Sequence, residues 1–115
     1  MSEEKHPDCV LIYCHRNNPD EVLFILKDRP KWQAGRLNLP GGKVEMYETV
    51  AWAARRELME ETGYECATEP EVIGKIIVRD FVVWIVKTTI SSDKDPQGRV
   101  GETEVAQWIN WREAN

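Results

Sequence analysis

Residues 39–64 read LPGGKVEMYETVAWAARRELMEETGY, and the rest of the chain is organised around this stretch. Its second half repeats apolar residues at helical period, which predicts a helix over about residues 49–62. Gly63 follows directly, and glycine is typical of the residue with left-handed backbone geometry that ends an α-helix. A short strand is predicted at Leu37–Leu39, and the double glycine at 41–42 lets main-chain oxygens approach a ligand. The stretch therefore predicts a strand, a loop and a helix in series.

The predicted helix carries three glutamates on one side. Glu57, Glu60 and Glu61 are spaced i, i+3 and i+4, so at about 100° per residue they share one sector of the helix. Each like-charged pair costs a few tenths of a kcal/mol, and the last turn of a helix favours cations over anions. A solvated surface helix would gain nothing from this arrangement.

The acidic sector borders the face of the helix that is expected to pack on a sheet. That apolar face consists of Val50, Ala53, Ala54 and Leu58. A partly desolvated group of carboxylates is unfavourable unless its charge is compensated. The alternative is a solvated charged face, but such a face belongs on the side opposite the apolar residues. The pattern favours a bound divalent cation such as Mg²⁺, which prefers carboxylate oxygens.

The fixed positions of this stretch resemble the Nudix box, G-x5-E-x7-R-E-U-x-E-E-x-G-U, in which U is apolar. The nine matching residues are Gly42, Glu48, Arg56, Glu57, Leu58, Glu60, Glu61, Gly63 and Tyr64. The resemblance implies an α/β fold for residues 1–115, a Nudix-type α/β/α sandwich around a mixed, largely antiparallel sheet. It also implies hydrolysis of a nucleoside diphosphate linked to another group, with Mg²⁺ as cofactor and Mn²⁺ as its substitute. Bound Mg²⁺ would polarise the phosphorus, orient the substrate and lower the pKa of water.

The resemblance also implies roles for single residues. Glu57 and Glu61 are expected as direct metal ligands, with Glu60 as a further ligand or acting through water. The carbonyl of Gly41 is expected to complete the metal site. Arg56 is expected to orient the glutamates by ion pairing. Glu48 is expected either to support the metal ligands without touching the ion or to support the loop by pairing with Arg56.

The catalytic base has two candidate positions. A glutamate of the box, Glu60, is one. The other is an acidic residue of the loop before the last strand, where Glu102 is preferred over Glu104. Each of these two loop glutamates could equally be a residue that precedes the last strand and has no catalytic role.

Substrate choice is expected to depend on residues other than the fixed positions of the box. Arg29 and Arg36 lie in a basic loop that leads to the box, and Lys43 follows the double glycine. These side chains are candidates for phosphate contacts, with a solvated basic loop as the alternative. The markers of ADP-ribose enzymes are not evident near Arg79–Phe81, so a small nucleoside triphosphate is favoured. ADP-ribose or a nucleotide sugar is the alternative, and a nucleotide-sensing domain without catalysis is the alternative of another class.

Composition narrows the class of protein. The 115 residues carry a net charge of −5, with 42% hydrophobic and 30% charged residues, as in ordinary globular domains. Residues 44–72 contain two basic and eight acidic residues, which places the acidic excess at the box and argues against a nucleic-acid binder. No apolar run is long enough to span a bilayer. Three cysteines without CxxC spacing indicate reduced thiols in a cytoplasmic protein.

Further strands are predicted on both sides of the box. Asp8–His15 and Glu21–Lys27 are expected to form a mostly buried antiparallel hairpin, and Val72–Val78 and Phe81–Ile90 a second hairpin with a turn at 79–80. Val105–Trp111 is expected as the last strand.

The predicted fold departs from the family pattern at the end of the sequence. A helix that usually covers one face of the sheet would begin at Arg112, so it is expected to be short or absent. An uncovered apolar face favours association, which makes a homodimer a hypothesis.

Overall fold

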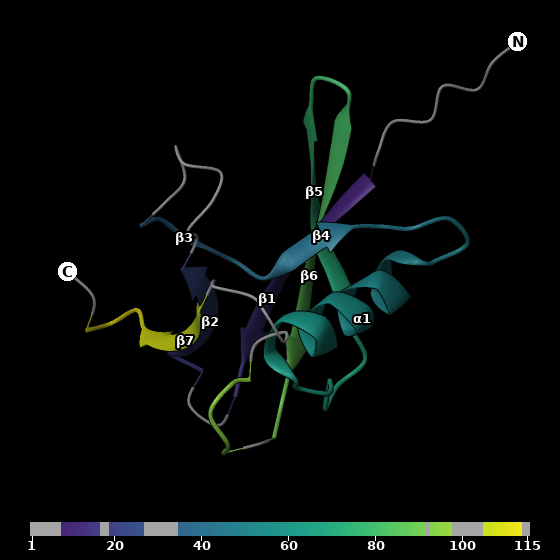
Figure 1. Cartoon of the computed structure of the whole chain (residues 1–115). Coiled ribbons are helices and arrows are strands. Elements are labelled where there is room, and N and C mark those ends of the chain that lie inside the picture. The colour runs from purple at the N-terminus through teal and green to yellow at the C-terminus, as the bar shows by residue number, and fades with distance from the viewer. Residues whose placement is uncertain (1–7, 17–18, 27–34, 92, 98–104, 114–115) are drawn as a thin grey trace, which may run out of the picture.

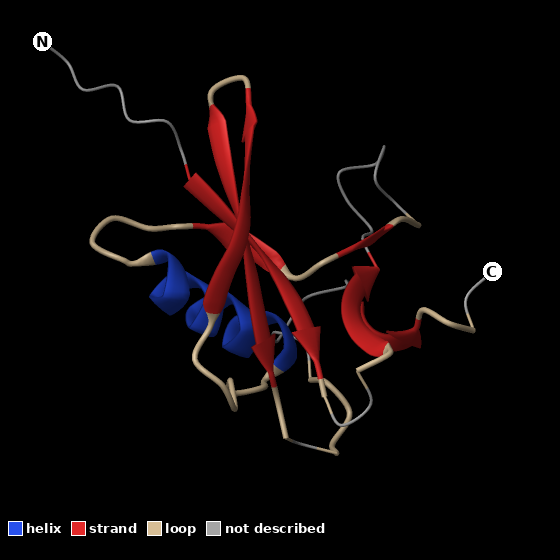
Figure 2. Cartoon of the chain, turned by 180° about the vertical axis from the view of Figure 1, so that it is seen from behind, coloured by secondary structure: helices blue, strands red, loops and turns tan. Residues whose placement is uncertain are grey.

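A computed structural model describes residues 8–16, 19–26, 35–91, 93–97 and 105–113. The elements in chain order are β1 (Asp8–His15), β2 (Glu21–Leu26), β3 (Leu37–Asn38), β4 (Gly41–Lys43), α1 (Val50–Thr62), β5 (Glu71–Val78), β6 (Phe81–Thr89) and β7 (Val105–Asn110). Helix α1 lies on one side of the strands (Figure 1). Seen from behind, the central strands lie in front of the helix (Figure 2).

The seven strands form one mixed sheet. Its main order is β3-β2-β1-β6-β5, while β4 pairs with β1 and β7 pairs with β2. β1 pairs in parallel with β6 over all eight of its residues, and the other pairings between described strands are antiparallel. The mixed, largely antiparallel sheet predicted from the sequence is therefore confirmed.

The expected hairpin of β1 and β2 is only partly correct. These strands run antiparallel but meet at one residue pair, His15 and Val22. β1 instead pairs with β6, and β2 pairs along its whole length with β7. The prediction that both strands are mostly buried was also wrong for β1, because its residues alternate between buried and half-buried. The reason is that only one face of β1 is covered by α1.

Helix α1 begins and ends where local chemistry predicts. The Thr49 hydroxyl accepts a hydrogen bond from the Trp52 amide at 3.1 Å, which caps the first turn. Gly63 adopts φ 79°, in the left-handed region, and its amide donates to the Met59 carbonyl at 2.8 Å. The helix has 13 residues, and no helix in the described part of the chain is long and apolar enough to cross a membrane.

The core lies between α1 and the central strands. Its main members are Val10, Ile12, Cys14, Leu23, Ala53, Ala54, Leu58, Tyr64, Val86 and Ile90. Trp84 and Trp108 are half-buried and pack against this cluster. Small residues on the helix let it approach the sheet closely, which brings its acidic sector to the sheet as well.

The second predicted hairpin is confirmed. β5 and β6 pair antiparallel around a turn at Arg79–Asp80, and Arg79 has φ 53°. The hairpin extends away from the body of the molecule (Figure 1). β5 is exposed at nearly every position, whereas the Val86–Thr88 part of β6 reaches the core.

Candidate functional site

The site is built where the edge of β4 that pairs with no described strand faces α1. On its other edge β4 pairs with β1. The Pro40 carbonyl and the Val44 amide, just before and just after β4, both form hydrogen bonds with β1. The main-chain groups of Gly41 and Lys43 therefore point the other way, towards the helix. The Gly41 amide donates to Glu61 Oε1 at 2.9 Å, and the Lys43 carbonyl accepts from Arg56 Nη2 at 2.9 Å. Side chains of α1 thus take the place of a neighbouring strand.

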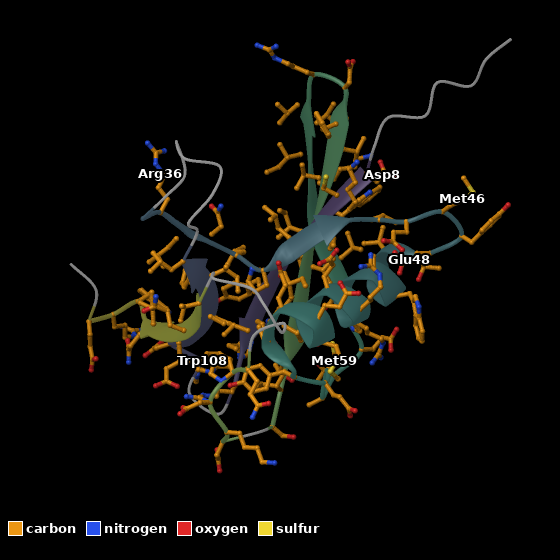
Figure 3. All side chains as sticks on the ribbon, viewed as in Figure 1. Asp8, Arg36, Met46, Glu48, Met59 and Trp108 are labelled. Atoms are coloured by element: carbon orange, nitrogen blue, oxygen red, sulfur yellow. The ribbon has the colours of Figure 1, made fainter. Side chains whose placement is uncertain are left out.

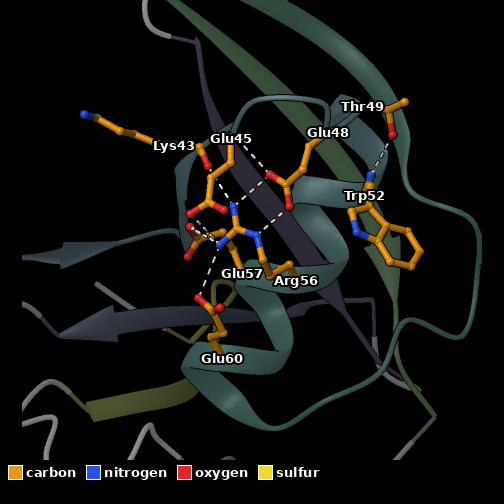
Figure 4. A network of polar contacts seen from close by, with 8 residues as sticks. All are labelled: Lys43, Glu45, Glu48, Thr49, Trp52, Arg56, Glu57 and Glu60. Atoms are coloured by element: carbon orange, nitrogen blue, oxygen red, sulfur yellow. Dashed lines mark hydrogen bonds and ion pairs between the residues drawn. The ribbon is translucent and has the colours of Figure 1, made fainter.

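Arg56 is the centre of the polar network at this edge (Figure 4). Its Nε and Nη2 donate to the two carboxylate oxygens of Glu48 at 2.6 and 2.9 Å, a bidentate pair. Its Nη1 lies 3.1 Å from Glu57 Oε2 and 3.3 Å from Glu60 Oε1. One guanidinium group therefore ties the loop before the helix to two of its glutamates.

The network shifts the protonation equilibria of its members. The hydrogen bond from Arg56 holds the pKa of Glu48 below its ordinary value, and the Glu45 amide, 2.8 Å from Glu48 Oε1, acts in the same direction. The hydrogen bond to Glu48 in turn raises the pKa of Arg56, and the charge of Glu57 adds to this. Both side chains are therefore ionised at neutral pH, which keeps the loop attached to the helix.

Gly42 leaves room for the Glu57 carboxylate. A Cβ atom added to Gly42 would lie 2.3 Å from Glu57 Oε2 and 2.6 Å from its carboxylate carbon. Such a contact is too close for real atoms, so any side chain here would displace Glu57. Glu57 is 9% exposed although it carries a charge. The glycine therefore fixes how closely this carboxylate approaches the strand.

Glu61 lines a cavity beside the free edge of β4. The cavity has a volume of about 320 Å³, and its walls include Gly41, Gly42, Leu39, Leu11 and Val83. It combines a carboxylate and glycine main chain with apolar side chains from β1 and β6. This combination of a few polar groups and apolar walls is typical of sites for small molecules.

The predicted metal ligands are near one another but do not form a closed cage. Glu57 and Glu61 flank Gly41–Gly42, while Glu60 is exposed and bonded to Arg56. Within the described residues, no three His, Cys, Asp or Glu side chains are grouped closely enough to hold a metal ion. The metal site therefore stays a prediction at this stage.

The other predicted residues are placed less favourably or not described. Arg36 is exposed beside β3, far from Glu48 in Figure 3. The Lys43 side chain points away from the glutamates in Figure 4, and only its carbonyl joins the network. Arg29 and Glu102 lie outside the described residues, so their positions remain predictions.

Sequence reasoning missed two parts of the site. It assigned no role to Glu45, whose amide donates to Glu48 and whose carboxylate lies 3.9 Å from Arg56 Nη1. It also missed the cavity wall formed by Leu11 and Val83. Glu45 lies three residues before Glu48, a spacing typical of a side chain that bonds back to a loop amide. The wall residues required knowledge that β1 and β6 are neighbours.

Comparisons with known proteins identify a family for this chain. A model of the NUDIX domain matches residues 5–115. The 8-oxo-dGTP diphosphatase of Escherichia coli is 42% identical over 48 residues, which is 42% of this chain and 37% of that protein. The ADP-ribose pyrophosphatase of Saccharomyces cerevisiae is 36% identical over 66 residues, 57% of this chain and 25% of that protein. The match thus spans well under half the length of these curated relatives.

A solved structure supports the fold. A NUDIX-family hydrolase from Clostridium perfringens superposes with a TM-score of 0.76 at 18% identity, covering 96% of this chain and 86% of that chain. At this identity the likeness establishes the α/β/α arrangement of the fold and no specific activity.

Proposed function

This chain belongs to the Nudix hydrolase family, and we propose that it hydrolyses the pyrophosphate linkage of a nucleoside diphosphate joined to another group. The preferred substrate in this proposal is a small nucleoside triphosphate, cut to the monophosphate and pyrophosphate. The observation that carries the proposal is the pair Glu57 and Glu61 at the glycine edge of β4, beside an apolar cavity. The relative from Escherichia coli, which is named as an 8-oxo-dGTP diphosphatase, supports the substrate class.

The residues at this edge fit a magnesium ion. The donors are all oxygens: the carboxylates of Glu57 and Glu61, and the Gly41 carbonyl, which lies on the same edge of β4 as the Gly41 amide bonded to Glu61. Mg²⁺ usually binds one or two carboxylates, and substrate phosphates and water complete its six ligands. A site without a third acidic ligand therefore suits this ion. The chemistry a divalent cation supplies here is charge neutralisation and orientation of the phosphates.

The residues of the chain then have separate tasks. Arg56 holds the carboxylates of Glu57 and Glu60 in place and is itself fixed by Glu48. A glutamate, Glu60 or Glu102, accepts a proton from the attacking water. The water oxygen bonds to one phosphorus atom as the bond between that phosphorus and the bridging oxygen breaks. The leaving group departs with the bridging oxygen: it is pyrophosphate if the α-phosphorus is attacked and the nucleoside monophosphate if the β-phosphorus is attacked.

Recognition of the substrate is assigned to the cavity and to the basic side chains predicted from the sequence. The apolar walls from β1 and β6 suit the flat face of a base, while Arg29, Arg36 and Lys43 are the candidates for phosphate contacts. ADP-ribose is the second candidate substrate, because the yeast relative that matches 57% of this chain is named for it. All three cysteines are free thiols, which suits a reducing compartment, so we place the activity in the cytoplasm.

A panel of nucleotides tests the proposal. Each compound is incubated with the protein and Mg²⁺ or Mn²⁺, and the products are identified by chromatography. Reaction in ¹⁸O-labelled water shows which phosphorus is attacked, because the label enters only that product. Binding of nucleotide without any product would instead support the sensing domain, and neither binding nor product would contradict both functions.

The variant Glu61→Gln tests the assigned ligand. Glutamine keeps an oxygen that can accept from the Gly41 amide, so the fold is retained while the charge is lost. Turnover is expected to fall more than about 100-fold, beyond the loss typical of groups that only support a ligand. Glu65→Gln removes one charge just beyond the helix and serves as the control. Equal turnover in both variants would contradict the metal assignment.

A further inference from the structure

β5 ends the sheet on one side, and large apolar side chains around it are exposed. The sheet order stops at β5, and no strand in the described ranges pairs with its outer edge. The exposed side chains are Val72, Ile73, Ile76, Ile77, Val78 and Phe81, each between 43% and 65% exposed. We call these six residues the β5 patch.

The β5 patch covers both faces of the strand. Ile76 and Ile77 are adjacent, so their side chains point to opposite faces, and both are at least half exposed. A strand with one covered face buries every second residue, as β1 does. Apolar patches of this kind are uncommon on monomers, and an open strand edge is a template for pairing with another strand. The strand therefore has the properties of an interface.

The charges of the hairpin suit the approach of an identical molecule. Residues 71–89 contain three basic residues and two acidic residues, which gives +1, although the whole chain carries −5. The acidic groups of the site gather around Arg56 on α1 instead. The hairpin extends away from α1 (Figure 1). Two copies that meet through their hairpins thus avoid the repulsion expected from their total charge.

We propose that β5 pairs antiparallel with β5 of a second copy of this chain about a two-fold axis. Such a contact is self-complementary, because the same patch is used on both copies. With the axis beside Ile76, each Lys75 lies opposite Ile77 of the partner subunit, so the two ammonium groups stay apart. The pairing satisfies the outward N–H and C=O groups of both strands, and it places side chains of the β5 patch beside those of the partner's β5, which reduces their exposure. It leaves the edge of β4 and its cavity open to substrate.

Light scattering coupled to size exclusion tests this interface over a wide range of protein concentration. Wild-type protein is expected to form a dimer, and Ile77→Lys is expected to raise the dissociation constant more than about 100-fold, since the charge is introduced twice. Val105→Lys places the same charge at a residue of β7 that is 56% exposed, and it is expected to leave the dimer intact. Circular dichroism checks that each variant is folded.

A second measurement keeps the proposal testable if Ile77→Lys fails to fold. Amide hydrogen exchange of the wild type at low and high concentration is expected to show slower exchange within residues 74–78 at high concentration only. Ile76→Lys, on the other face of β5, is expected to remove that protection. A monomer at every concentration overturns the proposal, and so does a dimer that persists in both β5 variants.

Discussion

Main-chain groups at the edge of a strand need hydrogen-bond partners, and the outer edges of β4 and β5 meet this requirement in different ways. Both strands have main-chain groups that no strand among the described residues satisfies. At β4 the side chains of Glu61 and Arg56 bond to those groups, and carboxylates gather there as a result. At β5 no described strand pairs with the outer edge, and the exposed side chains around it are mostly aliphatic. An edge satisfied by charged side chains becomes a place for chemistry, while an edge left apolar becomes a place for association.

The largest effect is expected from removing the arginine that holds the β4 edge. In Arg56→Ala the carboxylate of Glu48 loses its bidentate ion pair and that of Glu57 loses its ion pair with Arg56, and both side chains are only 11% exposed. Removing one partner of a largely buried ion pair destabilises strongly, so the free energy of unfolding is expected to fall by about 3 kcal/mol. Urea unfolding followed by circular dichroism measures it.

The neighbouring arginine provides a matched control for that change. Arg55 bonds to Glu69, whose side chain is 74% exposed, so this is a surface pair. Arg55→Ala is expected to cost no more than about 1 kcal/mol. Similar losses for the two variants would mean that the β4 edge does not depend on Arg56.

A smaller effect is expected from adding one methyl group at the β4 edge. Gly42→Ala forces the Glu57 carboxylate to move, since the new Cβ would lie 2.3 Å from its oxygen. Overpacking of this kind lowers the free energy of unfolding by about 1–3 kcal/mol. Turnover is expected to fall by more than this loss of stability explains. Thermal unfolding and a hydrolysis assay measure the two effects.

Gly74→Ala makes the same change on β5. There the nearest atom, a carbon of Ile85, is 3.8 Å from the added Cβ, an ordinary contact. Stability and turnover are expected to stay close to the wild type, within about 0.5 kcal/mol for stability. A marked loss of turnover in Gly74→Ala, with none in Gly42→Ala, would contradict the roles given to the β4 and β5 edges.

The stability that the Glu48–Arg56 pair contributes is expected to depend on pH. The folded-state pKa of Glu48 lies below its ordinary value of 4.5, so the pair contributes stability above that pH. The contribution is lost as the pH falls through the folded-state pKa. Glu48→Gln keeps neutral hydrogen bonds but cannot titrate. The difference in the free energy of unfolding between wild type and Glu48→Gln is therefore expected to disappear below about pH 4.5. Urea unfolding curves recorded at a series of acidic pH values measure this difference. A difference that stays constant would contradict the ion pair.

Local chemistry made the centre of the fold predictable from sequence. Thr49 and Gly63 cap α1 within one residue of the predicted bounds, because capping depends only on adjacent residues. The small residues Ala53 and Ala54 identified the packed face, and Glu57 lies at its border as expected. The pairing of Arg56 with Glu48 followed from the family resemblance and is present in the structure.

Non-local features were less predictable. β1 and β2 are adjacent in sequence, yet β1 pairs mainly with β6, because strand partners depend on the whole sheet. The bond from the Gly41 amide to Glu61 has no residue signature, since every residue other than proline carries the same amide. The aliphatic run of β5 predicts a strand but does not say whether its faces are covered. Burial therefore had to come from the structure.

The burial of Cys14 gives this protein a built-in chemical reporter. Its side chain is fully buried on β1, and burial, with a smaller contribution from Cys66, raises the pKa of the thiol to about 12. The thiolate is the reactive form, so at neutral pH a thiol reagent modifies Cys14 only in molecules whose core has opened. The rate of that labelling measures how often β1 separates from α1 under native conditions.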